Sequence, residues 1–408
     1  MRIAFHGAAG SVTGSNHLIQ TEGGTLMIDC GMFQGPKEIR TRNHLAFAYQ
    51  PQTIDAVIIT HAHIDHSGRL PRLVKQGYSG PIYATPATAE LLRILLLDSA
   101  HIQMSDSSWE NKKRKRKGQE LIQPLYDDQD VEATLKLVRA VDYHTPFQVL
   151  PNVRATFHDA GHIMGSSFLE LAITEHGITR TLIGGGDLGR SHQAIIGDPE
   201  VGDRADMVMI ESTYGNRRHK NEEDTNAELI AVLKEVVETR GTLLIPAFAV
   251  GRTQEMLYRL FELSQSNSIP AMPVFVDSPM AREVTRIYEL HKDLYDEKTL
   301  EYVRLGKNPL RTPDLHFTES VEDSMSLNDV PGPKIILSAS GMCDAGRIVH
   351  HLKHNIWQKN CHILFVGYQA EGTLGRRIIE GAKKVSILGE TLQVNADLFG
   401  TLDDAAPQ

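Results

Sequence analysis

The sequence predicts an α/β protein that is built from two or three compact units. Its 408 residues exceed the roughly 100–200 residues of one ordinary domain. The first half reads as short β-type runs separated by glycine-rich turns, whereas strands and helices alternate strictly after about residue 206. Such alternation is typical of a parallel sheet flanked by helices. We therefore expect a strand-rich first domain at 1–205, followed by an α/β domain.

The first half is predicted to contain mostly strands. The run Ala56–Thr60 is continuously apolar, which is typical of a strand buried on both faces. Thr85 and Pro86 form a helix start, an N-cap residue followed by proline, and we expect this helix to end near His101. A turn at 175–177 makes the last two strands a hairpin. The predicted strands are Ile3–Phe5, His17–Gln20, Thr25–Asp29, Ala56–Thr60, Pro81–Thr85, Val153–His158, Ser167–Thr174 and Thr179–Ile183.

In the second half, each predicted strand is followed by a helix. Sites in α/β folds commonly lie at the carboxyl ends of such strands. The expected strands are Asp206–Glu211, Thr242–Pro246, Pro273–Asp277, Lys334–Ala339 and Cys361–Val366, and the expected helices are Thr225–Thr239, Arg252–Gln265, Met280–His291, Ala345–Asn355 and Leu374–Ile379.

Composition and charge exclude several classes of protein. Hydrophobic residues make up 41% of the chain and charged residues 23%, which excludes a disordered or collagen-like protein. The net charge of −9 argues against nonspecific coating of nucleic acid, although a local basic patch is compatible with it. The three cysteines lack CxxC spacing and predict neither a disulfide framework nor a structural zinc knuckle. No apolar run reaches the roughly 18 residues of a membrane span, so we expect a cytoplasmic protein without a membrane partner.

A cluster of metal-binding residue types directly follows the apolar run at 56–60. It reads His61-Ala62-His63-Ile64-Asp65-His66, the pattern HxHxDH. Imidazole nitrogens and a carboxylate oxygen suit zinc and other first-row metals. In an extended or looped backbone the first two histidines can hold one ion, while the aspartate and the last histidine turn towards a second. An accidental group of surface histidines is the alternative, and both the spacing and the position after a strand disfavour it.

Two further segments supply candidate ligands. Residues 159–166 present His162 among small residues, and residues 181–190 place Asp187 at the end of a strand among glycines. Alone, each would more often be structural, but the order of all three segments favours a ligand role. A carboxylate such as Asp187 can bridge two cations. Zinc lowers the pKa of bound water from 15.7 to about 7, and two ions about 3.5–4 Å apart stabilise charge during in-line displacement at phosphorus. The predicted chemistry is metal-assisted hydrolysis.

These motifs resemble those of the metallo-β-lactamase fold, and the second half narrows the resemblance to the β-CASP group of RNA-processing nucleases. The matching segments of the second half are Glu211–Gly215, Ile245–Thr253, Asp277–Ala281, Ser338–Gly346 and Val366–Leu374. The resemblance extends from residue 1 to about 390 and implies a prokaryotic relative of the polyadenylation endonuclease subunit. The implied fold is an αββα sandwich at 1–205, an inserted β-CASP domain at 206–380 that caps its cleft, and a truncated return to the lactamase-like domain at 381–408.

The resemblance implies a zinc-dependent RNA phosphodiesterase with two zinc ions per chain. It implies endonucleolytic cleavage of single-stranded RNA, with 5′-exonuclease activity as a further mode, and homodimer formation. Asp65, Asp187 and Glu211 are the carboxylates expected to act in catalysis. Glu211 matches a family residue that orients a catalytic histidine, and the alternative is a strand-end carboxylate that caps the next segment. The implied ligands are His61, His63 and His162 for one zinc and Asp65 and His66 for the other, with Asp187 between them.

The chain departs from the family pattern after the segment 366–374. Family members carry two further histidines there, one that supports proton transfer to the leaving group and one that completes the second zinc site. In this sequence the last histidine is His362, within a predicted strand. The alternative function is therefore an impaired or non-catalytic RNA-binding homologue. The three glycines before Asp187, where the family generally has a larger residue, predict a local loosening of the strand end.

Substrate contacts are predicted in loops of the second half. Ser340 and Gly341 precede a helix whose N-terminus is suited to a phosphate, although small residues there can also serve packing. Arg252, at another helix start, is expected to add a charge-assisted phosphate contact. The basic segment 216–220 is expected to line the same cleft. The run Lys112–Lys117, in a polar stretch after a helix, is either an RNA contact or a solvated connection, with nuclear import least favoured.

Two other interpretations are disfavoured by the sequence. The glycine-rich segment 7–14 superficially suggests a dinucleotide loop, but no acidic ribose partner follows at the expected place, so we interpret it as a turn near the cleft. A lactamase-fold hydrolase that acts on thioesters or lactams is the other enzymatic alternative, and the β-CASP-like second half argues against it.

Overall fold

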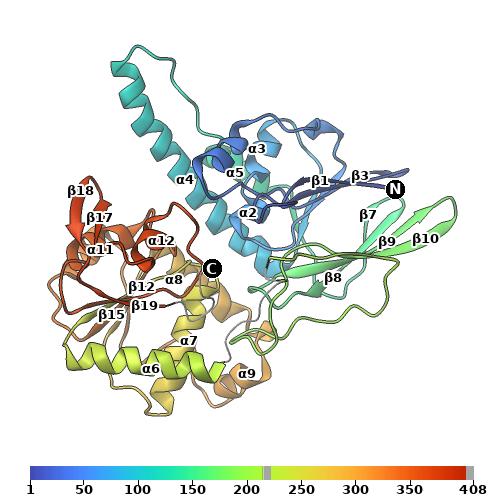
Figure 1. The fold of residues 1–408 in the computed structure, drawn as a ribbon. Coiled ribbons are helices and arrows are strands. Elements are labelled where there is room, and N and C mark those ends of the chain that lie inside the picture. The colour runs from blue at the N-terminus through green and yellow to red at the C-terminus, as the bar shows by residue number, and fades with distance from the viewer. Residues whose placement is uncertain (214, 216–221, 401–408) are drawn as a thin grey trace. The chain divides into compact units, whose positions relative to one another are not determined.

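The computed structural model describes residues 1–213, 215 and 222–400. The chain divides into two compact units, Met1–Thr213 and Tyr214–Gln408. Figure 1 shows the course of the chain through the helices and strands of each unit. Within the described residues, no helix combines the length and the apolar character that crossing a membrane requires.

Two β-sheets pack face to face in the first unit. The first sheet contains, in this order, β1 (Arg2–Gly7), β2 (Asn16–Thr21), β3 (Gly24–Ile28), β4 (Ala56–Ile58), β5 (Ile82–Ala84) and β6 (Val138–Ala140). The second contains β11 (Met207–Met209), β10 (Ile178–Gly184), β9 (Ser167–Glu175), β8 (Val153–Asp159) and β7 (Phe147–Leu150). Apolar side chains of both sheets, among them Ile28, Ile58, Phe157 and Leu169, form one buried cluster.

Burial of these strands follows from their residue pattern. Ala56, Val57 and Ile58 of β4 are all fully buried, as predicted for a continuous apolar run that pairs in parallel with strands on both sides. In β9, by contrast, burial alternates, so that Leu169 and Leu171 face the cluster between the sheets. The predicted hairpin is confirmed, because β9 and β10 pair in antiparallel fashion around the turn at 175–177.

The long helix of the first unit extends beyond its predicted end. Thr85 caps it by accepting a hydrogen bond from Thr88 N, as predicted, but the helix ends at Arg116 and not near His101. Its buried side chains end at Ala100, so the apolar pattern stops there although the helix continues. The cations of the run at 112–116 occupy its last turns, where positive charge stabilises a helix. The helices are α1 (Lys37–Arg40), η1 (Thr41–His44), η2 (Pro51–Thr53), α2 (Ile64–Ser67), α3 (Leu70–Lys75), α4 (Pro86–Arg116) and α5 (Asp128–Leu135).

The second unit has a parallel sheet covered by helices on both faces. Its strands are, in spatial order, β14 (Leu315–Phe317), β13 (Val274–Asp277), β15 (Lys334–Ser338), β12 (Thr242–Pro246), β16 (Cys361–Leu364) and β19 (Asp397–Phe399), and every pair is parallel. Leu243 and Ile245 of β12 belong to one apolar cluster, whereas Leu244 between them belongs to another. Because successive side chains of a strand point to opposite faces, these clusters lie on the two faces of the sheet.

The helices of the second unit follow the predicted alternation, with additional short elements between them. They are α6 (Glu222–Glu238), α7 (Arg252–Gln265), α8 (Pro279–Leu290), η3 (Lys292–Leu294), α9 (Glu297–Arg304), α10 (Val321–Ser326), α11 (Arg347–Asn355) and α12 (Leu374–Ile379). α6 and α7 contribute to the first apolar cluster, and α11 and α12 contribute to the second. A hairpin of β17 (Lys384–Ile387) and β18 (Glu390–Gln393) follows α12.

The compact units differ from the predicted domain boundaries at two places. The first unit ends at Thr213 and not at residue 205, because β11 pairs with β10 of the first unit. The segment 381–408 was expected to return to the first domain, but its described part lies in the second unit. There β19 pairs with β16 and thereby satisfies the backbone groups of an edge strand. The limits of the lactamase-like and β-CASP domains stay predictions.

The three glycines before Asp187 allow close packing, and the predicted loosening of the strand end stays a prediction. All three have positive φ angles, of 143°, 90° and 78°. A Cβ atom on Gly184 would lie only 1.8 Å from the carbonyl oxygen of Met209 in β11, and one on Gly186 would lie 2.7 Å from Thr60 Cβ. Glycine therefore lets β10 approach β11 and lets the next residues approach the loop after β4.

Gly184→Ala is expected to lower the free energy of unfolding of the first unit by about 1–3 kcal/mol, because it adds both backbone strain and a clash with β11. Urea unfolding monitored by circular dichroism measures this change. Gly177→Ala is the matched control, since Gly177 also has a positive φ angle, of 74°, but open space around its Cβ position. Equal effects of the two substitutions would contradict the role given to close packing.

Candidate metal centre

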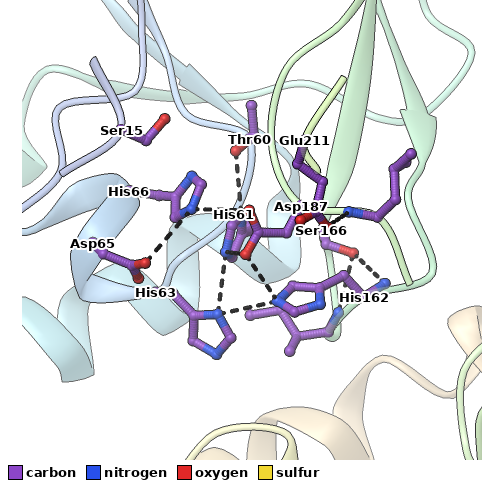
Figure 2. A network of polar contacts seen from close by, with 12 residues as sticks. Ser15, Thr60, His61, His63, Asp65, His66, His162, Ser166, Asp187 and Glu211 are labelled. Atoms are coloured by element: carbon purple, nitrogen blue, oxygen red, sulfur yellow. Dashed lines mark hydrogen bonds and ion pairs between the residues drawn. The ribbon is translucent and has the colours of Figure 1, made fainter. Parts of the chain in front are cut away.

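The HxHxDH segment lies directly after the buried strand β4, and Figure 2 shows its side chains from close by. His61 and His63 belong to the loop after β4, whereas Asp65 and His66 belong to the short helix α2. Backbone contacts hold this helix in place, for example the hydrogen bond of 2.8 Å from Cys30 N to the carbonyl oxygen of His66. The ring of His66 in α2 lies beside that of His61 in the preceding loop, with 4.0 Å between the ring centroids, and the predicted division of the ligands between two ions stays a prediction.

Three imidazole rings and one carboxylate converge at this loop. His61 Nε2 lies 3.1 Å from His63 Nδ1, which lies 3.2 Å from His162 Nε2. Asp187 Oδ2 lies 3.6 Å from His162 Nε2 and 3.9 Å from His61 Nε2. One potential ligand atom from each of the four residues lies within 4.8 Å of the others. Tetrahedral zinc separates its ligand atoms by about 3.3 Å, so the donor set fits a cation of this size.

Asp187 also faces the second pair of predicted ligands. His66 Nε2 lies 3.2 Å from Asp187 Oδ1 and 3.9 Å from Asp65 Oδ2. The two oxygens of Asp187 therefore face different groups, with Oδ2 towards His61 and His162 and Oδ1 towards His66 (Figure 2). This is the arrangement that a bridging carboxylate requires.

Asp29 is a residue of the site that the motifs did not reveal. It directly follows β3, is fully buried, and adopts a positive φ angle of 59°. Its Oδ2 accepts a hydrogen bond of 2.7 Å from His66 Nδ1, and its Oδ1 accepts one of 2.9 Å from Thr60 N. The bond to Nδ1 directs Nε2 of His66 towards Asp65 and Asp187, as partners of metal-binding histidines commonly do. The signal in the sequence that could have identified Asp29 was its place at the end of a strand next to β4.

Ser166 positions the histidine of the second segment. Its Oγ accepts hydrogen bonds from His162 N at 3.0 Å and from Ile163 N at 3.2 Å. Both Ser166 and Ser167 are buried, and Ser167 N donates to the carbonyl oxygen of Thr60 at 2.8 Å. The loop that carries His162 is thus joined to the loop that carries the HxHxDH motif.

Burial favours the neutral form of two of the converging imidazoles, those of His61 and His63. It lowers the pKa of His61 well below the usual value, and the positive charge of His66 adds to this effect. Burial also lowers the pKa of His63 to about 3, with a further contribution from His162. A neutral imidazole has one ring nitrogen with a lone pair, which is the form that binds a metal cation.

The electrostatic environment of His66 favours the charged form of its ring, in contrast to the environments of His61 and His63. Burial alone would lower its pKa, but the charges of Asp187, Asp29 and Asp65 raise it well above the usual value. Burial would likewise raise the pKa of Asp187, but the charge of His66 holds it well below the usual range. Burial raises the pKa of Asp65 to about 6. Without a metal, the His66 imidazolium thus balances carboxylate charge, and a cation that binds there must displace its proton.

Glu211 lies beside the segment that carries Asp187. Its Oε1 accepts a hydrogen bond of 3.2 Å from Leu188 N, and its Oε2 accepts one of 3.4 Å from Thr213 N. A pocket of about 400 Å³ in the first unit is lined by His66, Asp187 and Glu211, among other residues. Residues of the glycine-rich segment 7–14 also line it, which agrees with a turn near the site.

The predicted substrate contacts lie in loops of the second unit. Arg252 begins α7, where its Nη1 donates a hydrogen bond of 2.6 Å to Glu255. Ser340 and Gly341 follow β15, and a Cβ atom on Gly341 would lie 2.9 Å from the ring of Phe248. Thr253 N donates to the carbonyl oxygen of Phe248 at 3.2 Å, so the loops before α7 and after β15 meet at this ring. The basic segment 216–220 lies outside the described residues.

Family models match both halves of the chain. The model described as the metallo-beta-lactamase superfamily matches residues 10–178, and the Beta-Casp domain model matches residues 253–378. A crystal structure of a protein of unknown function from Enterococcus faecalis V583 covers 98% of this chain and 87% of its own, with a TM-score of 0.53 and 13% identity. That similarity supports the fold alone.

Curated relatives are similar over nearly the whole chain. Ribonuclease TTHA0252 of Thermus thermophilus is 39% identical over 398 residues, which cover 98% of this chain and 86% of the relative. Transcription termination factor FttA of Methanosarcina mazei is 33% identical, and that of Methanocaldococcus jannaschii is 32% identical. The chain spans 61% of the length of each of these archaeal relatives. With both domain models and these relatives in agreement, the chain belongs to the β-CASP family within the metallo-β-lactamase superfamily.

Proposed function

We propose that this protein is a zinc-dependent RNA phosphodiesterase that cleaves single-stranded RNA internally. The observation that carries the proposal is the convergence of His61, His63 and His162 with Asp187, whose other oxygen faces His66. The name of the Thermus thermophilus relative, a ribonuclease, supports RNA as the substrate. The 5′-exonuclease mode and the homodimer stay predictions.

The donor set supports zinc over a harder cation. Three imidazole nitrogens with one carboxylate oxygen suit zinc, whereas magnesium and calcium prefer oxygen ligands. We propose one zinc on His61, His63 and His162 and a second on Asp65 and His66, with Asp187 shared between them. When bound, zinc at this site lowers the pKa of water and supplies positive charge near a phosphate.

The residues of the chain would then position the reactants. We propose that Asp187 and Asp65 orient the attacking water, and that Asp29 fixes the ring of His66 through Nδ1. Glu211 would hold the segment after Asp187 through Leu188 N. Arg252 and the loop at Ser340 and Gly341 are proposed to contact the RNA backbone, because guanidinium and backbone N–H groups bind phosphate oxygens.

The Asp65→Ala/His66→Ala variant tests this function. It is expected to lose the second zinc and to lower the rate of cleavage of a labelled single-stranded RNA by about 10²–10⁴-fold. Elemental analysis after dialysis and gel electrophoresis of the RNA measure the two effects. His101→Ala/Asp128→Ala is the matched control, because these residues form an exposed ion pair of 3.3 Å elsewhere in the first unit.

A non-catalytic or impaired RNA-binding homologue is the second candidate. The observation that favours it is that, within residues 1–213, 215 and 222–400, the carboxylate oxygens within 4.0 Å of His66 Nε2 belong to Asp65 and Asp187 alone. If the unaltered chain, saturated with zinc, binds RNA but leaves it intact, the enzyme assignment fails. If it cleaves RNA and the double variant does not, the second candidate is excluded.

The proposal places the protein in the cytoplasm. Cys30, Cys343 and Cys361 are all buried free thiols. Burial raises the pKa of Cys30 to about 12, which keeps that thiol protonated and unreactive. Free thiols of this kind agree with a reducing compartment.

A further inference from the structure

A second group of metal-binding side chains lies in the second unit. It consists of Glu235 of α6, His362 of β16 and Asp397 of β19. One potential ligand atom from each residue lies within 4.8 Å of the others. His362 and Asp397 are also directly paired in the register of the two parallel strands, which brings their side chains to the same face of the sheet.

The imidazole ring of His362 is held in one orientation. It is fully buried, and its Nε2 lies 2.8 Å from Thr239 Oγ1. The hydroxyl of Thr239 lies 2.9 Å from the carbonyl oxygen of Glu235 and donates its proton there. Thr239 therefore accepts a hydrogen bond from Nε2–H of His362, which leaves the lone pair of the neutral ring on Nδ1. The edge of the ring also packs closely on Gly241, where a Cβ atom would lie 2.9 Å from Cδ2.

The Nδ1 atom of His362 is buried and has no hydrogen-bond partner within the described part of the chain. Asp397 Oδ2 lies 3.7 Å away, beyond hydrogen-bonding distance, and a carboxylate oxygen of Glu235 lies within 4.8 Å of a ring nitrogen of His362 and of a carboxylate oxygen of Asp397. A lone pair that faces two carboxylates is repelled by them unless a positive charge lies between.

We propose that Glu235, His362 and Asp397 bind a divalent transition-metal ion, with zinc as the best match. One imidazole nitrogen and two carboxylate oxygens are suitable zinc ligands, and water would complete the tetrahedron. A tetrahedral site needs ligand atoms about 3.3 Å apart. The carboxylates of Glu235 and Asp397 make no hydrogen bond to another described residue, which leaves both able to rotate towards this spacing.

The hydrogen bond to Thr239 matches the environment of metal-binding histidines. Such histidines commonly donate their second ring N–H to a neighbouring acceptor, which fixes the tautomer. The ion would join a helix to two strands, α6 to β16 and β19, at the edge of the sheet. Its expected effect is to hold β19 in place, since the other edge of this strand has no neighbour among the described strands.

The test uses the full chain without its first metal centre, so that the outcome is independent of the proposed function. His61→Ala/His63→Ala/Asp187→Ala is prepared as the background variant, incubated with ZnCl₂, dialysed and analysed for zinc by elemental analysis. The background is expected to retain one zinc ion per chain. Adding Glu235→Gln/Asp397→Asn is expected to remove it, whereas adding Glu238→Gln, an exposed residue on the same helix, is expected to leave it.

Hydrogen exchange provides a second measurement that does not depend on stoichiometry. The amide of Phe365 faces the carbonyl oxygen of Phe399 at 3.4 Å across β16 and β19. At a free zinc concentration a hundred times the dissociation constant, opening of this region becomes about a hundredfold less frequent if zinc binds only the closed form. The proposal is overturned if the background retains no zinc, if the Glu235→Gln/Asp397→Asn variant retains it, or if zinc protects this amide equally in both.

Discussion

Asp187→Asn is expected to lower the rate of single-stranded RNA cleavage by at least about 10³-fold, the largest effect of any single substitution in the chain. Asp187 faces both groups of candidate ligands, through Oδ2 towards His61 and His162 and through Oδ1 towards His66. The amide removes a negative charge and replaces one oxygen by an N–H donor, which repels a cation. Single-turnover cleavage of a labelled RNA and zinc content per chain measure the two consequences.

Asp203→Asn is the matched control for this substitution, because Asp203 is exposed and belongs to the same unit. It is expected to leave cleavage and zinc content unchanged. Full activity of the Asp187→Asn protein would show that the convergence of side chains at the HxHxDH motif does not perform the chemistry.

Asp277→Ala is expected to lower the free energy of unfolding of the second unit by about 3–5 kcal/mol at neutral pH. Asp277 is fully buried at the end of β13 and accepts hydrogen bonds from Arg347 at 2.7 Å, His351 at 2.6 Å and Ser324 at 2.6 Å. Removing the carboxylate leaves donors of α11 and α10 without their acceptor in a buried place. Urea unfolding measures the change.

The stabilisation by Asp277 is expected to depend on pH. Burial alone would raise the pKa of Asp277, but hydrogen bonds from His351, Ser324 and other donors hold it well below the usual range. Because the folded-state pKa is depressed, the stabilisation is complete above the unfolded-state pKa of about 3.9 and decreases as the pH falls below it. The difference in unfolding free energy between the unaltered chain and the variant should therefore be smaller at pH 3 than at pH 7. Thr373→Ala, which removes the N-cap of α12 in the same unit, serves as a control without this pH dependence.

The sequence predicted those parts of the fold that local patterns determine. The apolar run at β4, the N-cap and proline that begin α4, and the alternation of β12 and α7 all depend on residues close together in the chain. The HxHxDH motif could be recognised in the sequence for the same reason, because its residues are close together in the chain. The approach of its side chains to His162 and Asp187 depends on how β4, β9 and β10 pack. In the sequence, the order of the motifs indicated this approach only through the family resemblance.

The parts that were missed depend on contacts between distant residues. The second half of α4 has no buried side chain to reveal its periodicity, and Lys113 Nζ instead lies over the ring of Trp109, 3.1 Å from its centroid. Asp29 acquires its significance from His66, 37 residues away. The place of β19 depends on β16, which offers an unpaired edge that only the folded sheet creates.

One consequence of the short strand β11 concerns mechanics. The polypeptide leaves the first unit immediately after Glu211 and Thr213, and the carboxylate of Glu211 is joined to the amide that follows Asp187. Because β11 also pairs in parallel with β10, a displacement of the chain at Glu211 would be transmitted to the segment that carries Asp187 by two routes, the strand pairing and the hydrogen bond to Leu188 N.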